Sequence, residues 1–185
     1  SKTKNDANSD LDTTADAAKK AIDKTSGLTA DQKQAAKDQI DQAVTAAKKA
    51  IDKADSNADV TKAINNGTVA IDKVSANAAI DGALAEKNNS IDTAPNLTDE
   101  EKKAVKEQAN KAADKAKSAI NTAQDNDAVK QAQTDGVNNI NGITVPTDSD
   151  VKKNANSDLA KTAAAAKQAI DKTSGLTADQ KQAAK

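Results

Sequence analysis

Aliphatic residues recur along this chain every three or four positions, the spacing of one face of a helix. Residues 7–24 carry such a seam, made of Leu11, Ala15, Ala18 and Ile22. The stretch Thr-Ser-Gly at 25–27 follows directly, and glycine readily adopts the left-handed backbone conformation that ends a helix. The pattern therefore predicts a first amphipathic helix over about 7–24.

Two further helices are predicted by the same kind of seam. Residues 30–54 form the second, with the positions Ala36, Ile40, Ala43 or Val44, Ala47 and Ile51. The third begins near residue 58 and carries Val60, Ile64, Gly67, Ile71 and Val74. Connections of two to five residues favour antiparallel neighbours. The three segments therefore predict a small up-down-up bundle.

A helix-start signal precedes the second helix and recurs twice. Residues 28–33 read Leu-Thr-Ala-Asp-Gln-Lys, and related sequences stand at 97–102 and 176–181. A Thr hydroxyl at such a start can accept from the backbone N–H three residues on, while Gln or Glu at that position reaches back to the Thr N–H. Each copy is therefore predicted to cap a helix and to mark one unit of a tandem repeat.

A shift of 69 residues superimposes a second unit on the first. Matching pairs include Leu11 with Ile80, Ala15 with Leu84, Ile22 with Ile91, Leu28 with Leu97, Ile51 with Ile120, Val60 with Val129, Ile71 with Ile140 and Val74 with Ile143. Residues 74–79 contain no strong helix breaker. We therefore expect repeat 1 over 1–75 and repeat 2 over 76–145, with the third helix of repeat 1 continuing into the first helix of repeat 2.

A third copy of the pattern follows after an insertion. Residues 155–185 repeat residues 7–37 almost residue for residue, at a shift of 148, so ten residues are added between the second and third copies. Pro146 lies in that insertion, and proline interrupts helices. We expect a linker over 146–153 and a partial repeat 3 over 154–185. The predicted fold is all-α, with tandem three-helix bundles forming an elongated rod.

Three residues, at two positions of the repeat, break the regular seams. Gly67 and Gly136 coincide in the middle of the third helices, where glycine costs about 0.5–1 kcal/mol relative to alanine. Close approach of a neighbouring backbone is the favoured explanation, and a hinge or ligand notch is the alternative. Lys87 stands where repeat 1 has Ala18, and is expected to extend its charge out of a weak layer.

The composition tests whether such a chain can fold. It contains no aromatic residue and no Met, and alanine greatly outnumbers Leu, Ile and Val. A core this thin raises the alternative of disorder. However, the formal net charge is only −1 because 27 basic residues nearly balance 28 acidic ones. Alanine and lysine favour helices, so ordered helices with narrow seams are the preferred interpretation.

Several classes of function lack their usual residues. There is no Arg, basic face or aromatic residue for nucleic acid, and no His or Cys for a zinc site, a disulfide or a nucleophile–base pair. No apolar run is long enough to cross a bilayer, and no leader precedes repeat 1, although the sequence looks like an excised fragment. No catalytic, cofactor-binding or metal-binding residue is predicted, and the chain is not expected to be an enzyme.

Acidic residues near helix ends are the remaining candidates for chemistry. Asp23, Asp92 and Asp171 follow Ile at the end of equivalent helices, and we hypothesise that each caps or pairs with the next helix start rather than serving catalysis. Residues 55–59 resemble the opening of a calcium loop, but Val60 replaces the required glycine. A capping turn is therefore preferred to calcium binding.

The repeat pattern resembles a known family. Its elements are a seam ending in Ala-Ile-Asp, then Leu-Thr-x-x-Gln/Glu-Lys, and later Val-x-x-Ala with Gly-x-x-x-Ile; the most specific matches are residues 96–102 and the run from Val129 through Gly136 to Ile140. The pattern is similar to the tandem repeat called domain of unknown function 1542, found in cell-wall-anchored surface proteins of Gram-positive bacteria. The family brings no catalytic or ligand residues that could be carried over.

The resemblance implies an extracellular stalk that projects an adhesive domain from the cell wall, anchored through parts of a parent protein outside this sequence. The alternative is a low-affinity binding module for host matrix or cell-surface proteins, acting by avidity in adhesion or biofilm. Exposed aromatic or Arg hot spots are absent, which favours the stalk. Expected partners are neighbouring repeats and, through the parent protein, host matrix proteins; the fragment is expected to be a monomer.

Overall fold

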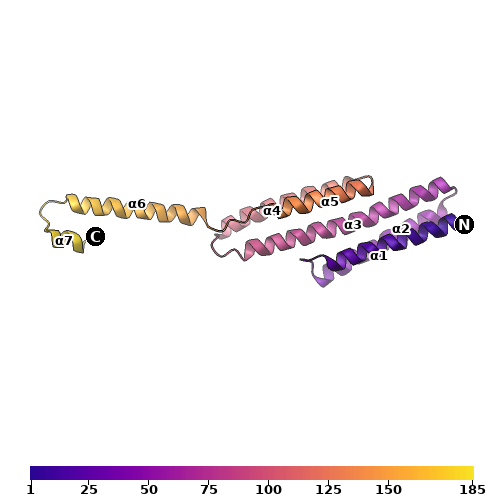
Figure 1. Ribbon diagram of the computed structural model, residues 1–185, viewed down its shortest axis with the longest axis horizontal. Coiled ribbons are helices and arrows are strands. Elements are labelled where there is room, and N and C mark those ends of the chain that lie inside the picture. Colours follow the sequence, from indigo (N-terminus) through magenta and orange to yellow (C-terminus); the bar gives the residue numbers. More distant parts are fainter. The chain divides into compact units, whose positions relative to one another are not determined.

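The computed structural model describes residues 1–185 and contains helices only (Figure 1). The helices are α1 (Lys2–Lys24), α2 (Ala30–Lys53), α3 (Asn57–Asp92), α4 (Asp99–Thr122), α5 (Asn126–Asn141), α6 (Asp150–Lys172) and α7 (Ala178–Ala183). The all-α fold predicted from the seams is therefore confirmed. Each predicted helix is present, although α1 begins at Lys2, five residues before the predicted helix start at residue 7.

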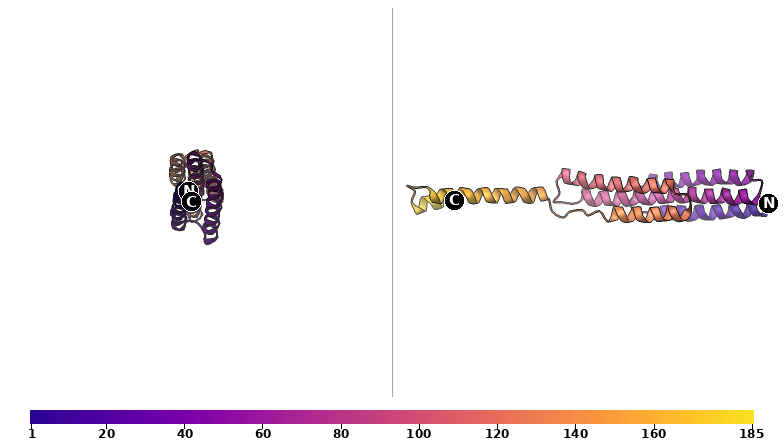
Figure 2. Two further views of the ribbon diagram at one scale, coloured as in Figure 1. Left: turned by 90° about the vertical axis from the view of Figure 1, so that its right-hand side faces the viewer. Right: turned by 90° about the horizontal axis from the view of Figure 1, so that it is seen from above.

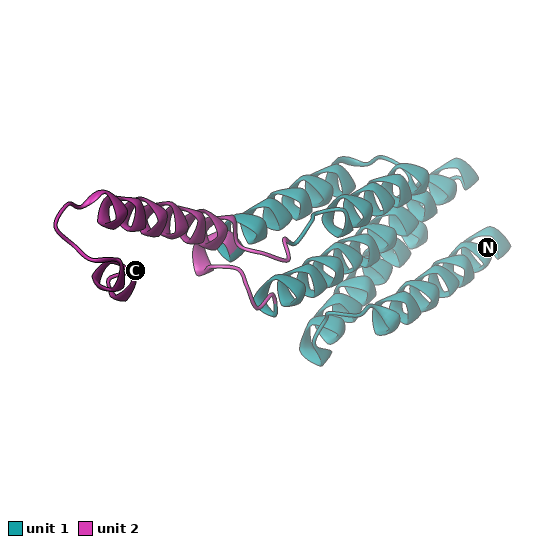
Figure 3. Ribbon diagram, turned by 60° about the vertical axis from the view of Figure 1, so that its left-hand side comes forward, with its two compact units in different colours: residues 1–93, 102–145 teal, residues 94–101, 146–185 magenta.

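The chain divides into two compact units (Figure 3). Unit 1 comprises Ser1–Thr93 and Lys102–Val145, and unit 2 comprises Ala94–Glu101 and Pro146–Lys185. Helix α4 begins in unit 2 and continues in unit 1, so each unit contains two separate stretches of chain.

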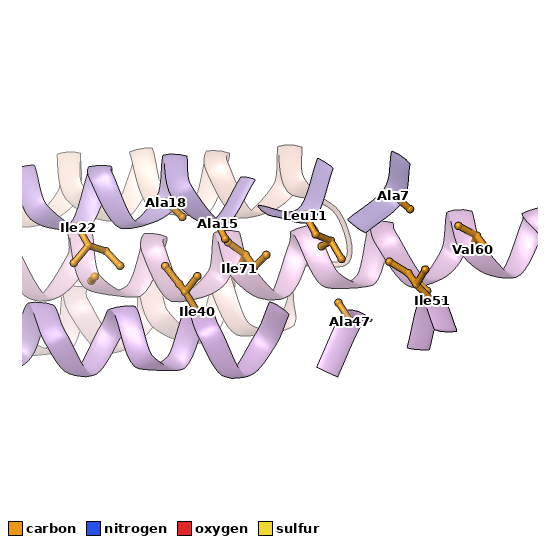
Figure 4. Packing of buried hydrophobic residues seen from close by; sticks show 12 residues of the cluster. Ala7, Leu11, Ala15, Ala18, Ile22, Ile40, Ala47, Ile51, Val60 and Ile71 are labelled. Atoms are coloured by element: carbon orange, nitrogen blue, oxygen red, sulfur yellow. The ribbon is translucent and has the colours of Figure 1, made fainter. Parts of the chain in front are cut away.

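Helices α1 and α2 pack on each other and on α3. The predicted seams supply the buried face, because Leu11, Ile22, Ile40, Ile51 and Ile71 are all fully buried. Figure 4 shows these side chains pointing into the space between the three helices. Alanine fills the positions between the large aliphatic residues, which lets the helices approach closely despite the small number of large side chains.

Helix α3 is shared by two bundles, as the absence of a breaker at 74–79 predicts. It runs without interruption for 36 residues. Its second half packs with α4 and α5 around a second core, whose largest fully buried members are Ile80, Ile120, Val129 and Ile140. The views of Figures 1 and 2 agree that α1 and α2 lie along the first part of α3, whereas α4 and α5 lie along its later part.

The two bundles of unit 1 are staggered along the shared helix by a defined step. Leu11 packs at the level of Gly67, and its repeat equivalent Ile80 packs at the level of Gly136. Because Gly67 and Ile80 both lie on α3, equivalent levels of the two repeats are 13 residues apart, about 20 Å at 1.5 Å per residue. This step is shorter than a helix, so the end of bundle 1 overlaps the start of bundle 2.

The predicted helix starts are confirmed in detail. Complete capping boxes pair Thr29 with Gln32 and Thr177 with Gln180. At the start of α4 the Thr98 N–H donates to Glu101 Oε2 at 2.9 Å, and the Glu101 N–H donates back to Thr98 Oγ1 at 3.2 Å. Ser56, in the stretch that resembles a calcium loop, caps α3 by accepting from the Asp59 N–H.

The interruption predicted around Pro146 is also present. Helix α5 ends at Asn141 and α6 begins at Asp150 after a non-helical segment. In unit 2 the seam of α6 is exposed, and Leu159 has 68% of its surface accessible, whereas its repeat equivalent Leu11 is fully buried. The division into repeats at 75/76, a linker at 146–153 and a partial third repeat stays a prediction.

Candidate functional site

No three acidic side chains converge in a way that could hold a metal ion. The hollows of unit 1 include two shallow grooves at equivalent places, one between α2 and α3 and one between α4 and α5. Their floors are Ala47 with Gly67 and Ala116 with Gly136. The distinctive features lie instead in bonds between helices, and most of them recur with the repeat.

Glycine at 67 and 136 allows the close packing of the helices. A Cβ at Gly67 would lie 2.5 Å from the Ala47 Cβ and 2.8 Å from Leu11 Cδ2. At Gly136 the same methyl would meet the Ala116 Cβ, and Ile80 Cδ1 at 2.7 Å. The close approach of a neighbouring helix is confirmed, with one correction, and the hinge or ligand notch stays a prediction. The nearest neighbours are side-chain methyl groups, because alanine already brings the opposing helix close.

Asp23, Asp92 and Asp171 each bond the following helix, as hypothesised. The Asp23 carboxylate pairs with Lys37 at 2.9 Å, and that of Asp92 pairs with Lys106 at 2.6 Å. Asp171 makes the corresponding pair with Lys185. All three lysines occupy equivalent positions in the repeat. The Asp23 and Asp92 carboxylates therefore join the first helix of each repeat to the second helix, through lysine side chains rather than through helix N–H groups, whereas Lys185 lies two residues beyond the end of α7.

The backbone carbonyls of the same acids accept a second lysine. Lys33 Nζ donates to Asp23 O at 2.8 Å, Lys102 Nζ to Asp92 O at 2.9 Å, and Lys181 Nζ to Asp171 O at 2.8 Å. These carbonyls lie in the last turn of a helix, where no intrahelical N–H is available for them. Lysine at the end of the Leu-Thr-x-x-Gln/Glu-Lys signal is thus a cap for the preceding helix.

Two lysines cap the second helices in the same way. Lys4 Nζ donates to Asp52 O at 2.7 Å, and Lys73 Nζ donates to Asn121 O at 2.8 Å. Sequence reasoning from seams missed both lysines, because each contacts a residue 48 positions away. A signal was nevertheless present, since Lys4 and Lys73 coincide under the shift of 69 that relates the two repeats.

The first joint between repeats is formed by a turn seated on the shared helix. Gly27, with φ of 78°, closes the turn between α1 and α2. A Cβ at Gly82 on α3 would lie 2.5 Å from both Ser26 O and Thr25 Cγ2. Only glycine at position 82 leaves room for this turn, so the end of bundle 1 is fixed against the part of α3 that belongs to bundle 2.

The second joint, within unit 2, replaces this contact with hydrogen bonds. Asn96 Nδ2 donates to Thr147 O at 2.9 Å, and Lys152 Nζ donates to Asn96 O at 2.8 Å. Asn96 is the repeat equivalent of Gly27. The chain at Pro146 is non-helical, as predicted, and hydrogen bonds tie its flanking residues to the turn that precedes α4.

Glu101 links the starts of two helices in unit 2. Its Oε2 completes the Thr98 capping box, and its Oε1 accepts from the Val151 N–H in the first turn of α6 at 3.4 Å. The Thr98 backbone N–H is the main cause that lowers the pKa of Glu101 from 4.5 to about 2. Smaller contributions come from Ser149, the buried N-cap of α6, and from Val151.

Lys87 makes hydrogen bonds that the expectation of a charge extending out of the layer did not include. Lys87 Nζ is held by two backbone carbonyls, Asn141 O at 3.1 Å and Ile143 O at 2.7 Å. These carbonyls belong to the end of α5 and the residues after it. The electrostatic attraction between a lysine and a helix C-terminus favours this arrangement. Lys87 therefore caps α5, in a place where repeat 1 has only Ala18.

These features define a class of protein: a tandem helical-repeat protein whose neighbouring repeats share a helix and whose helix ends are capped by lysines of other helices. The chain belongs to the domain of unknown function (DUF1542) family, whose model matches residues 3–78 and 72–148. The two matches overlap inside α3, the shared helix. Residues 156–185 match the model of another family, the GA module, although they repeat the sequence of residues 8–37 with few changes.

The curated relatives are very long proteins of Staphylococcus aureus. The chain is 30% identical over 195 residues to extracellular matrix-binding protein EbhA of strain Newman. This match covers 100% of the chain and 6% of EbhA. Identity to EbhA of strain Mu3 is 28%, over 3% of that protein, and identity to ebh of strain COL is 30%, over 2%. No solved structure matches the chain, and no helix has the length and apolar character needed to cross a bilayer.

Proposed function

We propose that the chain is a non-catalytic spacer of a bacterial cell-surface protein, in which each repeat lengthens a helical stalk by a fixed step. The shared helix α3 is the observation that carries this proposal. A joint made by continuous helix resists sharp bending, because a kink must disrupt backbone hydrogen bonds, whereas gentle curvature does not. The staggered packing sets the step at about 20 Å per repeat, as the 13-residue offset along α3 requires.

The setting of this stalk is part of the same proposal. The relatives are named extracellular matrix-binding proteins, and the chain corresponds to a few per cent of their length. We therefore place the chain outside the cell, anchored in the cell wall through other parts of a longer protein. In this position the repeats hold an adhesive domain away from the wall, and their partners are the neighbouring repeats.

Small-angle scattering of proteins with increasing numbers of the repeat tests the spacer function. Joining repeats by the continuous helix of residues 57–92 is expected to add about 20 Å to the maximum dimension for each repeat, with the cross-section unchanged. The matched series joins the same repeats through residues 142–153, where the helix is interrupted. A maximum dimension that stays constant as repeats are added to the first series would refute the spacer function.

A second candidate is a weak binding module that acts by avidity, favoured by the name of the relatives. Many copies on one chain could raise an affinity that is negligible for a single repeat. Binding to immobilised matrix proteins should then rise much faster than in proportion to repeat number. Equal binding per repeat at every array length, or no binding at all, would exclude the avidity-based binding module, and only the spacer function would remain.

A further inference from the structure

Two Asn-Gly steps occur in the chain, at residues 66–67 and 141–142. Asparagine followed by glycine is chemically labile, because glycine has no side chain to shield its backbone nitrogen from the neighbouring amide carbon. The reaction also needs a backbone that can leave its hydrogen-bonded conformation. The fold places the two steps in opposite environments, and this difference decides where the chemistry can occur.

The step at 141–142 lies at the end of a helix. Gly142 is the C-cap of α5, with φ of −72° and ψ of −11°, and its N–H donates to Asn138 O at 2.8 Å. Both Asn141 and Gly142 are exposed. Terminal turns open locally at a small fraction of the free energy of global unfolding. The Gly142 nitrogen can therefore be released while the rest of α5, held by buried Ile140, stays packed.

The step at 66–67 lies in the middle of α3. Gly67 is buried, and the Ala47 Cβ and Leu11 Cδ2 fill the space where its side chain would be. Releasing the Gly67 nitrogen requires breaking the helix on both sides and separating α1 and α2 from α3. Such an opening approaches global unfolding of the bundle. The chain thus contains a protected Asn-Gly step as an internal comparison for the accessible one.

We propose that Asn141 is a site of spontaneous covalent modification through a cyclic imide. The Gly142 nitrogen gives up its proton and attacks Asn141 Cγ. A bond forms between them, the bond from Cγ to Nδ2 breaks, and Nδ2 takes up a proton and leaves as ammonia. Water then opens the imide at either carbonyl. The products are aspartate or its isomer, in which the backbone passes through the former side chain; no oxidant or reductant takes part.

The modification acts on the Lys87 cap. Lys87 Nζ spans Asn141 O and Ile143 O, the two carbonyls on either side of Gly142. In the isomer the former backbone carbonyl of Asn141 becomes the free carboxylate, and a methylene group lengthens the backbone between residues 141 and 142, so the pair of carbonyls that Lys87 holds is lost. Either product also places a carboxylate near the negative end of α5. Reaction at Asn141 therefore loosens the end of repeat 2 where the helical part of the chain is interrupted.

Peptide mapping by mass spectrometry tests the site after the full chain is incubated in mildly alkaline buffer at body temperature. Conversion of Asn141 is expected to be at least roughly tenfold faster than conversion of Asn66, because the fold protects only the second. Equal rates at the two sites, or faster conversion of Asn66, would overturn the proposal.

Two controls separate the fold from the local sequence. In strong denaturant the two steps should convert at similar rates; if Asn141 keeps its full advantage there, the fold is not the cause and the proposal fails. The variant Gly142→Ala places a Cβ 3.1 Å from Asn138 O and 3.8 Å from Asn139 O, a tight but adjustable fit. It should fold and convert Asn141 at least roughly tenfold more slowly, because the methyl group shields the nitrogen. An unchanged rate in this variant also contradicts the proposal.

Discussion

Single atoms decide how closely the helices of each bundle approach. At Gly67 the missing methyl group is what allows Ala47 and Leu11 to meet α3, and Gly136 does the same for Ala116 and Ile80. The core contains few large side chains, so much of its packing comes from the backbones of neighbouring helices. Adding one carbon at either position therefore disturbs the packing of three helices.

Gly67→Ala is expected to destabilise the protein by about 1–2 kcal/mol, because overpacking of about 1–3 kcal/mol exceeds the helix-propensity gain of about 0.5–1 kcal/mol. Chemical denaturation measures the change in the free energy of unfolding. Gly142→Ala serves as the control, since its Cβ meets only carbonyl oxygens of its own helix end. An increase in stability for Gly67→Ala would show that the helices can move apart to admit the methyl group without loss of packing free energy.

Glu101→Gln is expected to free the start of α6 while leaving the start of α4 capped. Gln fills the same capping position at residues 32 and 180, but its one carbonyl oxygen cannot serve both helices. Hydrogen exchange should quicken at the Val151 amide and stay unchanged at the residue-101 amide, which donates to Thr98 Oγ1. Unchanged exchange at Val151 would mean that Glu101 does not hold α6.

Acid should have the same effect in the unchanged protein. The folded pKa of Glu101 is lowered to about 2, so ionised Glu101 favours the folded arrangement. This contribution is fully present above the unfolded pKa of 4.5 and is lost as the pH falls towards 2. A titration should show that the protection factor of the Val151 amide, which compares the observed exchange rate with the intrinsic rate at the same pH, falls over this window. The Glu101→Gln variant should show no such dependence.

At the scale of helices, the same few lysine bonds connect each element to the next. Asp23 and Asp92 tie a first helix to a second helix by a carboxylate and by a carbonyl at once. Each pair is partly exposed, so each bond is worth little alone. Their repetition at fixed positions specifies which helix lies beside which, where the alanine-rich seams alone are nearly uniform.

Asp23→Asn combined with Asp92→Asn is expected to lower stability by about 0.2–1 kcal/mol for each pair, with the larger loss at low salt. Thermal denaturation at two ionic strengths measures both effects. Asp16→Asn is a matched control, because Asp16 is an exposed acid of α1 that makes no ion pair. A melting temperature equal to that of the unchanged protein would exclude a structural role for Asp23 and Asp92.

The helices and their seams could be predicted from the sequence because they depend on local periodicity. Leu11, Ile40 and Ile71 are fully buried at the positions that the spacing of three and four indicates. The shared helix was also predictable, from the absence of a breaker. These features need no knowledge of which distant residues meet in space.

The joints could be predicted only in part, because they depend on contacts between distant residues. The break at Pro146 follows from one residue, but the bond from Lys152 to Asn96 spans 56 positions. The contact of the Thr25–Gly27 turn with Gly82 leaves no mark in the repeat, since the equivalent positions are Thr13 in the first copy and Lys161 in the third. The bonds of Lys87 could not be predicted, because its partners at the end of α5 lie 54 and 56 positions away.

For the whole molecule, the ten-residue insertion interrupts the regular spacing of the repeats. Deleting Gly142–Val151 would bring Lys152 to the position of Lys73 and Leu159 to that of Ile80. The result is expected to be a continuous helix from α5 into α6, with a rise in helical circular dichroism and a narrow distance distribution between spin labels on its two sides. Deleting five residues instead is the control, since it leaves the seams out of register. A broad distribution after the full deletion would show that further residues break the helix.

The sharing of α3 has a consequence for how the protein unfolds. In most repeat arrays each unit has its own stability, and neighbours interact through an interface. Here residues 71–82 of α3 contribute to both bundles, since Ile71 is buried in the first core and Ile80 in the second. Melting one repeat therefore removes part of the structure of the next, because the two repeats share one continuous backbone segment. Unit 1 should lose its helices in a single cooperative transition, and a change that destabilises either repeat will destabilise both.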